Sequence, residues 1–158
     1  MSMELLKDLA RVDILHVPYK GTGPALVDVV AGQVAMMMGN TLSVLPHIKS
    51  GKLRALGVSG TTRSAALLDV PTLAEGGVAR YESVQWYGLL APAGTPVAII
   101  NKLHTATVSA LGDADLKKHL AADGAEPVGN SPDAFGALIR SEITKWKAVA
   151  AAAGITPE

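Results

Sequence analysis

Short apolar runs alternate with amphipathic segments along the first part of the chain. The runs are rich in Val, Ile, Leu and Met and lie at residues 12–17, 34–38 and 53–58. Their length and composition are typical of buried strands. Segments with apolar residues at helical spacing lie at residues 2–11, 24–31 and 41–50. Because strands alternate with helices, the pattern predicts an α/β lobe of parallel type with right-handed crossovers.

The middle of the chain loses this regularity. Residues 59–84 mix Gly, Ser, Thr, Pro and charge, which predicts a surface excursion with one short helix at residues 72–76. A strand is predicted again at residues 85–91, which include Trp86 and Tyr87. These two rings either pack in a core or hinge, or line the flank of a ligand as amphipathic groups.

The last third is predicted to be helical. Three helices begin after the capping residues Thr95, Asp113 and Ser131, and a proline follows the first and the third of these caps. The third helix carries an apolar stripe, whose members are Phe135, Leu138, Ile139, Ile143, Trp146 and Val149. The change of pattern predicts pieces of two lobes, with an α/β part at residues 1–90 and a helical part at residues 91–158.

Composition narrows the class of protein. The chain has 158 residues, of which 49% are apolar and 18% charged, so it can bury a core. Its formal net charge of zero gives no support for a nucleic-acid partner. The lack of cysteine excludes disulfides, thiolate metal sites and cysteine nucleophiles. No apolar run reaches the roughly 20 residues that span a bilayer. The charged, amphipathic N-terminus is not a signal peptide, so the chain as given would stay in the cytoplasm.

Residues 17–24 connect the first predicted strand to its helix through a glycine pair. Gly21 and Gly23 allow backbone angles closed to other residues and a close approach of a ligand to the main chain. The free N–H groups and the positive dipole end of the following helix would face that ligand. This is the outline of an anion site, although a plain strand-to-helix connection needs the same residue types. The third glycine of a dinucleotide fingerprint is absent.

No other constellation indicates catalysis or a cofactor. The histidines, His16, His47, His104 and His119, lack the spacing of a helical metal site. His16 is predicted to lie in a core or crevice, and the other three on solvated helix surfaces. The methionines at residues 36–38 are predicted to fill the core. Ser59 lacks the leading glycine of a nucleophile elbow. We therefore expect neither an enzyme nor a bound cofactor or metal, and a hydrolase or transferase that uses Ser59 or Lys20 with a histidine is the alternative.

Several motifs resemble one known family, in the same order along the chain. They are VPYKG at 17–21, GQV at 32–34, LPHIKSGKLRAL at 45–56, DVPTLAEGG at 69–77 and WYGLLAPAGTP at 86–96. The chain resembles the Bug-type extracytoplasmic solute receptors of tripartite tricarboxylate transporters. The resemblance implies the fold of a type II periplasmic binding protein, in which two α/β lobes joined by a hinge close on a carboxylated ligand. It also implies a periplasmic location and the membrane permease as partner.

The same resemblance assigns ligand-binding residues. Its second-lobe loop corresponds to Tyr19, Lys20, Gly21, Thr22 and Gly23, whose main-chain N–H groups and a bound water would hold a carboxylate. The end of the next predicted strand corresponds to Gly39, Asn40 and Thr41, which would read the far end of the ligand. Since Gly39 has no side chain, polar selection there falls to Asn40 or Thr41.

The resemblance covers the carboxyl-terminal half of such a receptor. A chain of this extent lacks the first-lobe segment on which residues 95–154 pack in the family, so the apolar stripe would be left partly uncovered. We therefore expect a truncated receptor that self-associates as a homodimer. The alternative is a self-associating remnant that binds no ligand.

Overall fold

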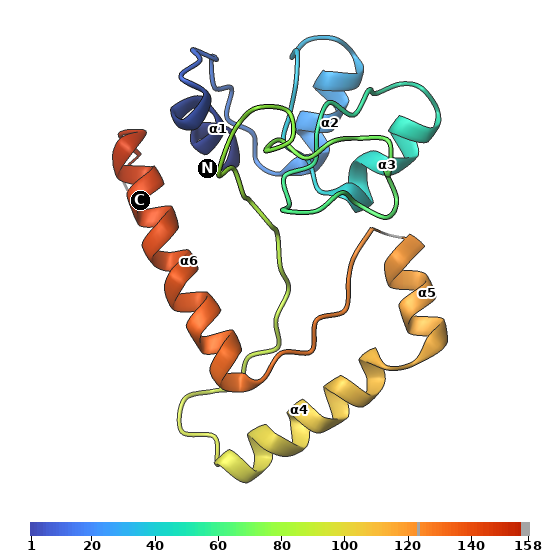
Figure 1. Ribbon diagram of the computed structural model, residues 1–158, viewed down its shortest axis with the longest axis vertical. Coiled ribbons are helices and arrows are strands. Elements are labelled where there is room, and N and C mark those ends of the chain that lie inside the picture. The colour runs from blue at the N-terminus through green and yellow to red at the C-terminus, as the bar shows by residue number, and fades with distance from the viewer. Residues whose placement is uncertain (123, 156–158) are drawn as a thin grey trace. The chain divides into compact units, whose positions relative to one another are not determined.

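The structure is a computed structural model that describes residues 1–122 and 124–155. The chain divides into two compact units, Met1–Gln85 and Trp86–Glu158. Whether they are the two predicted lobe pieces stays a prediction. The described residues contain six helices (Figure 1), which are α1 (Ser2–Ala10), α2 (Thr22–Val30), α3 (Thr41–Lys49), α4 (Val97–Leu111), α5 (Ala114–Ala122) and α6 (Pro132–Ala152).

The helices of the first unit confirm the predicted ones to within about two residues. α2 was predicted to open at Pro24, but it begins two residues earlier at Thr22. Proline is tolerated there because the first N–H groups of a helix have no intrahelical partner. α3 keeps Pro46 inside its length and buries Leu45. The apolar spacing therefore located both helices that flank the predicted site.

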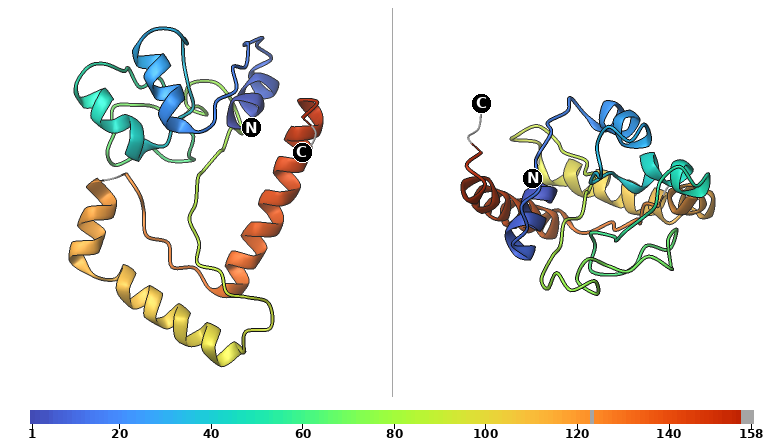
Figure 2. Two further views of the ribbon diagram at one scale, coloured as in Figure 1. Left: turned by 180° about the vertical axis from the view of Figure 1, so that it is seen from behind. Right: turned by 90° about the horizontal axis from the view of Figure 1, so that it is seen from above.

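The predicted strands are the main correction. Residues 12–17, 34–38 and 53–58 form no ladder in the described part of the chain and run as coil between the helices (Figure 2). One isolated parallel bridge joins Val58 to Thr72. A strand requires a partner for its main-chain groups and a cover for its side chains. The described residues form no ladder that would supply the partner, and the side chains are not covered, since Leu15 is 88% exposed and Leu56 is 61% exposed. The methionines predicted as core are also partly exposed, with Met36 at 40%.

Residues 59–84 were predicted to be a surface excursion, yet they supply the most buried side chains of the first unit. Tyr81 is 2% exposed and donates its hydroxyl proton to the main-chain oxygen of Ser2 at 3.0 Å. Burial raises the pKa of the Tyr81 phenol. The buried Ser83 hydroxyl lies 2.7 Å from that of Ser2, and its main-chain N–H donates to Ser59. These bonds join the end of the unit to its first helix.

The short helix predicted at residues 72–76 is a single closed turn. Thr72 N–H donates to Glu75 Oε2 at 2.7 Å, and Glu75 N–H donates to Thr72 Oγ1 at 3.0 Å. This is the reciprocal pairing of a capping box. Arg63 Nε also donates to Glu75 Oε2 at 2.9 Å. The hydrogen bond from the Thr72 main chain, followed by the one from Arg63, lowers the pKa of Glu75.

The second unit confirms two of three predicted helix caps. Asp113 Oδ1 accepts from Leu116 N–H at 2.9 Å, and Ser131 Oγ accepts from Ala134 N–H at 3.2 Å. Thr95 is not a cap, because its hydroxyl donates to the oxygen of Pro92 at 2.8 Å and α4 begins at Val97. None of the described residues of α4 or α6 is fully buried. None of the described helices is both long and apolar enough to cross a membrane.

The predicted strand at residues 85–91 has no regular secondary structure, and Trp86 and Gly88 within it pack on the start of α6. The rings of Trp86 and Phe135 meet edge to face, with centroids 5.2 Å apart and planes at 89°. Gly88 lies directly on the same ring, so that a Cβ there would overlap Phe135. Trp86 therefore has the packing role that was one of its two predicted alternatives. Tyr87 points outward and is 83% exposed.

Candidate functional site

The predicted anion loop forms the N-terminus of α2. Gly21 is the N-cap residue, with φ 111° and ψ 174°, and no side chain caps this helix end. Thr22 and Gly23 lie in the first turn, where main-chain N–H groups have no intrahelical partner. A Cβ at Gly21 or Gly23 would meet no atom within 4 Å. The structure thus places an open surface of N–H groups at the positive end of the α2 dipole.

Tyr19 is tied to the helix that follows the loop. Its hydroxyl donates to Asp28 Oδ2 at 2.6 Å, and both side chains are partly buried. The bond to Asp28 raises the pKa of the Tyr19 phenol. Lys20 is exposed. The sequence analysis missed Asp28, because a partner nine residues away through a turn matches neither helical nor strand spacing.

Asn40, predicted to read the far end of a ligand, is the N-cap of α3. Its Oδ1 accepts from Ser43 N–H at 2.9 Å. Among the described residues the amide nitrogen of Asn40 makes no hydrogen bond, so it can donate one to a ligand. Thr41 is the first residue of α3 and is partly buried. The capping role was missed, although an asparagine before an apolar helical pattern is a common capping signal.

Gly39 has a packing role that the sequence analysis also missed. A Cβ there would lie 2.6 Å from Val44 Cγ1 and 3.3 Å from Met37 Cε. The glycine therefore lets α3 start close to the preceding segment. This fixes the position of the neighbouring Asn40, whatever Gly39 contributes to a ligand.

Three histidines differ at least in part from their predicted surroundings. His16 was predicted to lie in a core or crevice; it is not in a core, since its side chain is 47% exposed, and its Nδ1 lies 3.1 Å from Glu4 Oε1. Lys7 Nζ lies 3.0 Å from the other oxygen of Glu4. Lys7 and then His16 lower the pKa of Glu4, against the effect of burial. His104 was predicted to be solvated, but its Nε2 is buried and has no hydrogen-bond partner among the described residues. His119 is exposed, as predicted.

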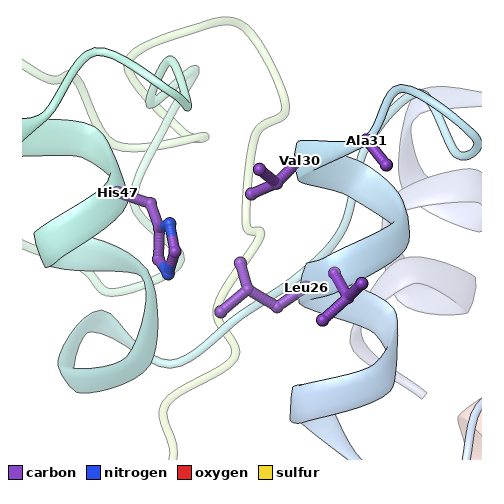
Figure 3. Close-up of a pocket in the computed structure, with 5 residues that line it drawn as sticks. Leu26, Val30, Ala31 and His47 are labelled. Atoms are coloured by element: carbon purple, nitrogen blue, oxygen red, sulfur yellow. The ribbon is translucent and has the colours of Figure 1, made fainter.

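His47 was also predicted to be solvated, and it instead lines a cavity between α2 and α3. The cavity has a volume of about 320 Å³, and the rest of its lining is Leu26, Val27, Val30 and Ala31. Figure 3 shows the His47 ring across from Leu26 and Val30. This lining offers one polar side chain, so it does not suit a carboxylate. Within the described chain, no three His, Asp or Glu side chains gather as a metal site.

Comparison with solved structures defines the class of protein. The chain matches "R. palustris Rpa4515 with adipate" with a TM-score of 0.88 and 38% identity, over 99% of this chain and 52% of that one. It matches "MatC (Rpa3494) from Rhodopseudomonas palustris with bound malate" with a TM-score of 0.80 and 36% identity, over 94% and 51%. The predicted fold class, a type II periplasmic-binding-protein lobe with a helical carboxyl-terminal part, is confirmed in its chain path. The predicted strands of this fold class are not paired into a sheet in the described residues.

Sequence comparison gives the family. A family profile described as "Tripartite tricarboxylate transporter family receptor" matches residues 1–155. A protein in the clcB-clcD intergenic region of Pseudomonas knackmussii is 38% identical over 147 residues, 92% of this chain and 87% of that protein. The chain belongs to the tripartite tricarboxylate transporter receptor family, whose members are solute-binding receptors. It spans 44% and 41% of two further curated relatives, about half of a receptor, as the resemblance implied.

Proposed function

We propose that the chain is the carboxylate-binding lobe of a solute receptor that serves a tripartite tricarboxylate transporter in the periplasm. The observation that carries this proposal is the uncapped N-terminus of α2 behind Gly21. Such an end attracts anions through its free N–H groups and its dipole. Two solved structures that the chain resembles are described with adipate and with malate, both dicarboxylates. A small dicarboxylate is therefore the ligand class that we assign.

Residues 1–90 would hold the carboxylate, and residues 91–158 would pack on the partner lobe of a receptor. The membrane permease of the transporter would be the macromolecular partner. The exposed apolar residues Leu15 and Leu56, in the runs at residues 12–17 and 53–58, support a further packing surface in residues 1–90. Such side chains are costly to leave in water.

The direct test is a titration of the purified chain with adipate, malate and hexanoate, followed by calorimetry and by thermal unfolding. We expect dicarboxylates to bind and to raise the unfolding temperature without being consumed. At a ligand concentration of 100 Kd the stabilisation is about 2.7 kcal/mol. A folded chain that binds none of these acids would instead support the non-binding remnant. Conversion of a ligand would support the enzyme alternative through Ser59 or Lys20.

Specificity is expected to depend on Asn40. In Asn40→Ser the hydroxyl keeps the α3 cap while the amide donor is lost. We expect this variant to lose more affinity for adipate than for hexanoate, because the second carboxylate is the group that the amide reads. Asn40→Ala loses the cap as well, at about 1 kcal/mol of stability. Equal losses for both acids in Asn40→Ser would contradict the assignment of Asn40 to the far end of the ligand.

A further inference from the structure

We propose that Asp28 is a positioning residue for the carboxylate site and acts through Tyr19. This inference rests on the proposed function. The observation is the 2.6 Å hydrogen bond from the Tyr19 hydroxyl to Asp28 Oδ2. A hydroxyl that donates to a carboxylate at this distance makes one of the stronger hydrogen bonds in proteins. The bond connects Tyr19, which precedes the glycine turn, to the last turn of α2.

The turn between these two anchors has little of its own to fix it. Lys20 is exposed, Gly21 has the glycine-specific φ of 111°, and no side chain caps the helix end. A loop of this kind loses conformational freedom when it orders around a ligand, and that loss reduces affinity. Because Tyr19 is fixed to α2, the main-chain N–H groups after it are oriented before the ligand arrives.

The position of the negatively charged Asp28 near a proposed anion site requires an explanation. Asp28 is six residues along the helix from Thr22, about 9 Å at 1.5 Å per residue, and its negative charge opposes that of an incoming acid. If Asp28 acted through its charge, removing the charge would improve binding. If it acts by holding Tyr19, removing the hydrogen-bond acceptor will weaken binding, and an uncharged acceptor will suffice.

Four variants separate these cases, with adipate as the probe. Tyr19→Phe and Asp28→Ala should each weaken adipate binding by about tenfold, the usual effect of one charge-assisted hydrogen bond. The double variant should be no weaker than the poorer single one, since both remove the same bond. Asp28→Asn keeps an acceptor oxygen and should restore affinity to within about threefold of the parent. Tighter binding in both Asp28 variants, or additive losses in the double variant, would overturn the inference.

A second readout needs no ligand. The Tyr19 phenol titrates above the ordinary tyrosine range when Asp28 holds its proton, so its pKa should fall in Asp28→Asn. Ultraviolet absorbance measured against Tyr19→Phe isolates this phenol from Tyr81 and Tyr87. An unchanged titration in Asp28→Asn overturns the inference while the proposed function stands. If the pKa of the Tyr19 phenol falls in Asp28→Asn as expected but the chain binds no acid, the proposed function is overturned. The positioning role of Asp28 is then overturned as well.

Discussion

Gly21→Val is expected to abolish dicarboxylate binding while the chain still folds. Gly21 has φ 111° and ψ 174°, a backbone region that is essentially restricted to glycine. Any residue with a Cβ costs about 1–3 kcal/mol there, and the backbone relieves the strain by rotating. Rotation at the N-cap turns the first N–H groups of α2 away from the ligand. Calorimetric titration with adipate measures the loss of affinity, and urea unfolding measures the loss of stability.

Gly77→Val is the matched control for this variant. Gly77 has a φ of 103° and, like Gly21, no atom within 4 Å of an added Cβ. It lies in the turn after Thr72, away from α2 in the sequence, so it should reproduce the strain without the loss of binding. Gly23 is not equivalent to Gly21, because its φ is not positive. The backbone angles that the sequence allowed at both glycines are adopted only by Gly21, so a substitution is strained only there. Parent-like adipate binding by Gly21→Val would mean that the site lies elsewhere.

The purified chain is expected to form a homodimer through the apolar faces of its carboxyl-terminal helices. Val97 is 73% exposed, while Ile99 and Ile143 are each 50% exposed. Burying such surface stabilises an interface by about 25 cal/mol per Å², and a stable interface typically buries about 1,600 Å² in total. We propose a second copy of the chain as the occupant, since a two-fold interface buries the same face on both chains. Light scattering at micromolar concentration should give twice the 16.2 kDa of one chain.

Ile143→Lys and Ala148→Lys test which face of α6 is buried in this dimer. Ile143 is in the apolar stripe, whereas Ala148 is exposed about 140° around the helix from it. We expect the first variant to shift the chain toward the monomer and the second to leave the mass unchanged. A parent chain that is monomeric at micromolar concentration, with the fluorescence of Trp146 shielded from quenchers, would contradict self-association.

Local signals in the sequence were reliable where the structure depends on neighbours along the chain. Asp113 and Ser131 cap their helices as predicted, because capping involves residues two or three positions apart. Gly21 was singled out for the same reason, since a turn into a helix constrains a single residue. The strand predictions failed because a strand also needs a partner that is distant in sequence. The apolar composition of residues 12–17 carries no information about whether such a partner is present.

Contacts that follow no regular sequence spacing account for two of the features that were missed. Tyr19 with Asp28, and Gly88 with Phe135, are brought together by the path of the backbone. No periodicity marks either pair. Asn40 was predicted as a ligand-binding residue, but its capping role was missed, although an asparagine before an apolar helical pattern is a common cap.

The contacts between the start and the end of the first unit also close that unit on itself. Tyr81 and Ser83, near its end, are bonded to Ser2 at its start. Because one residue holds both ends together, removal of Ser2 would release the first helix and the last segment of the unit at once.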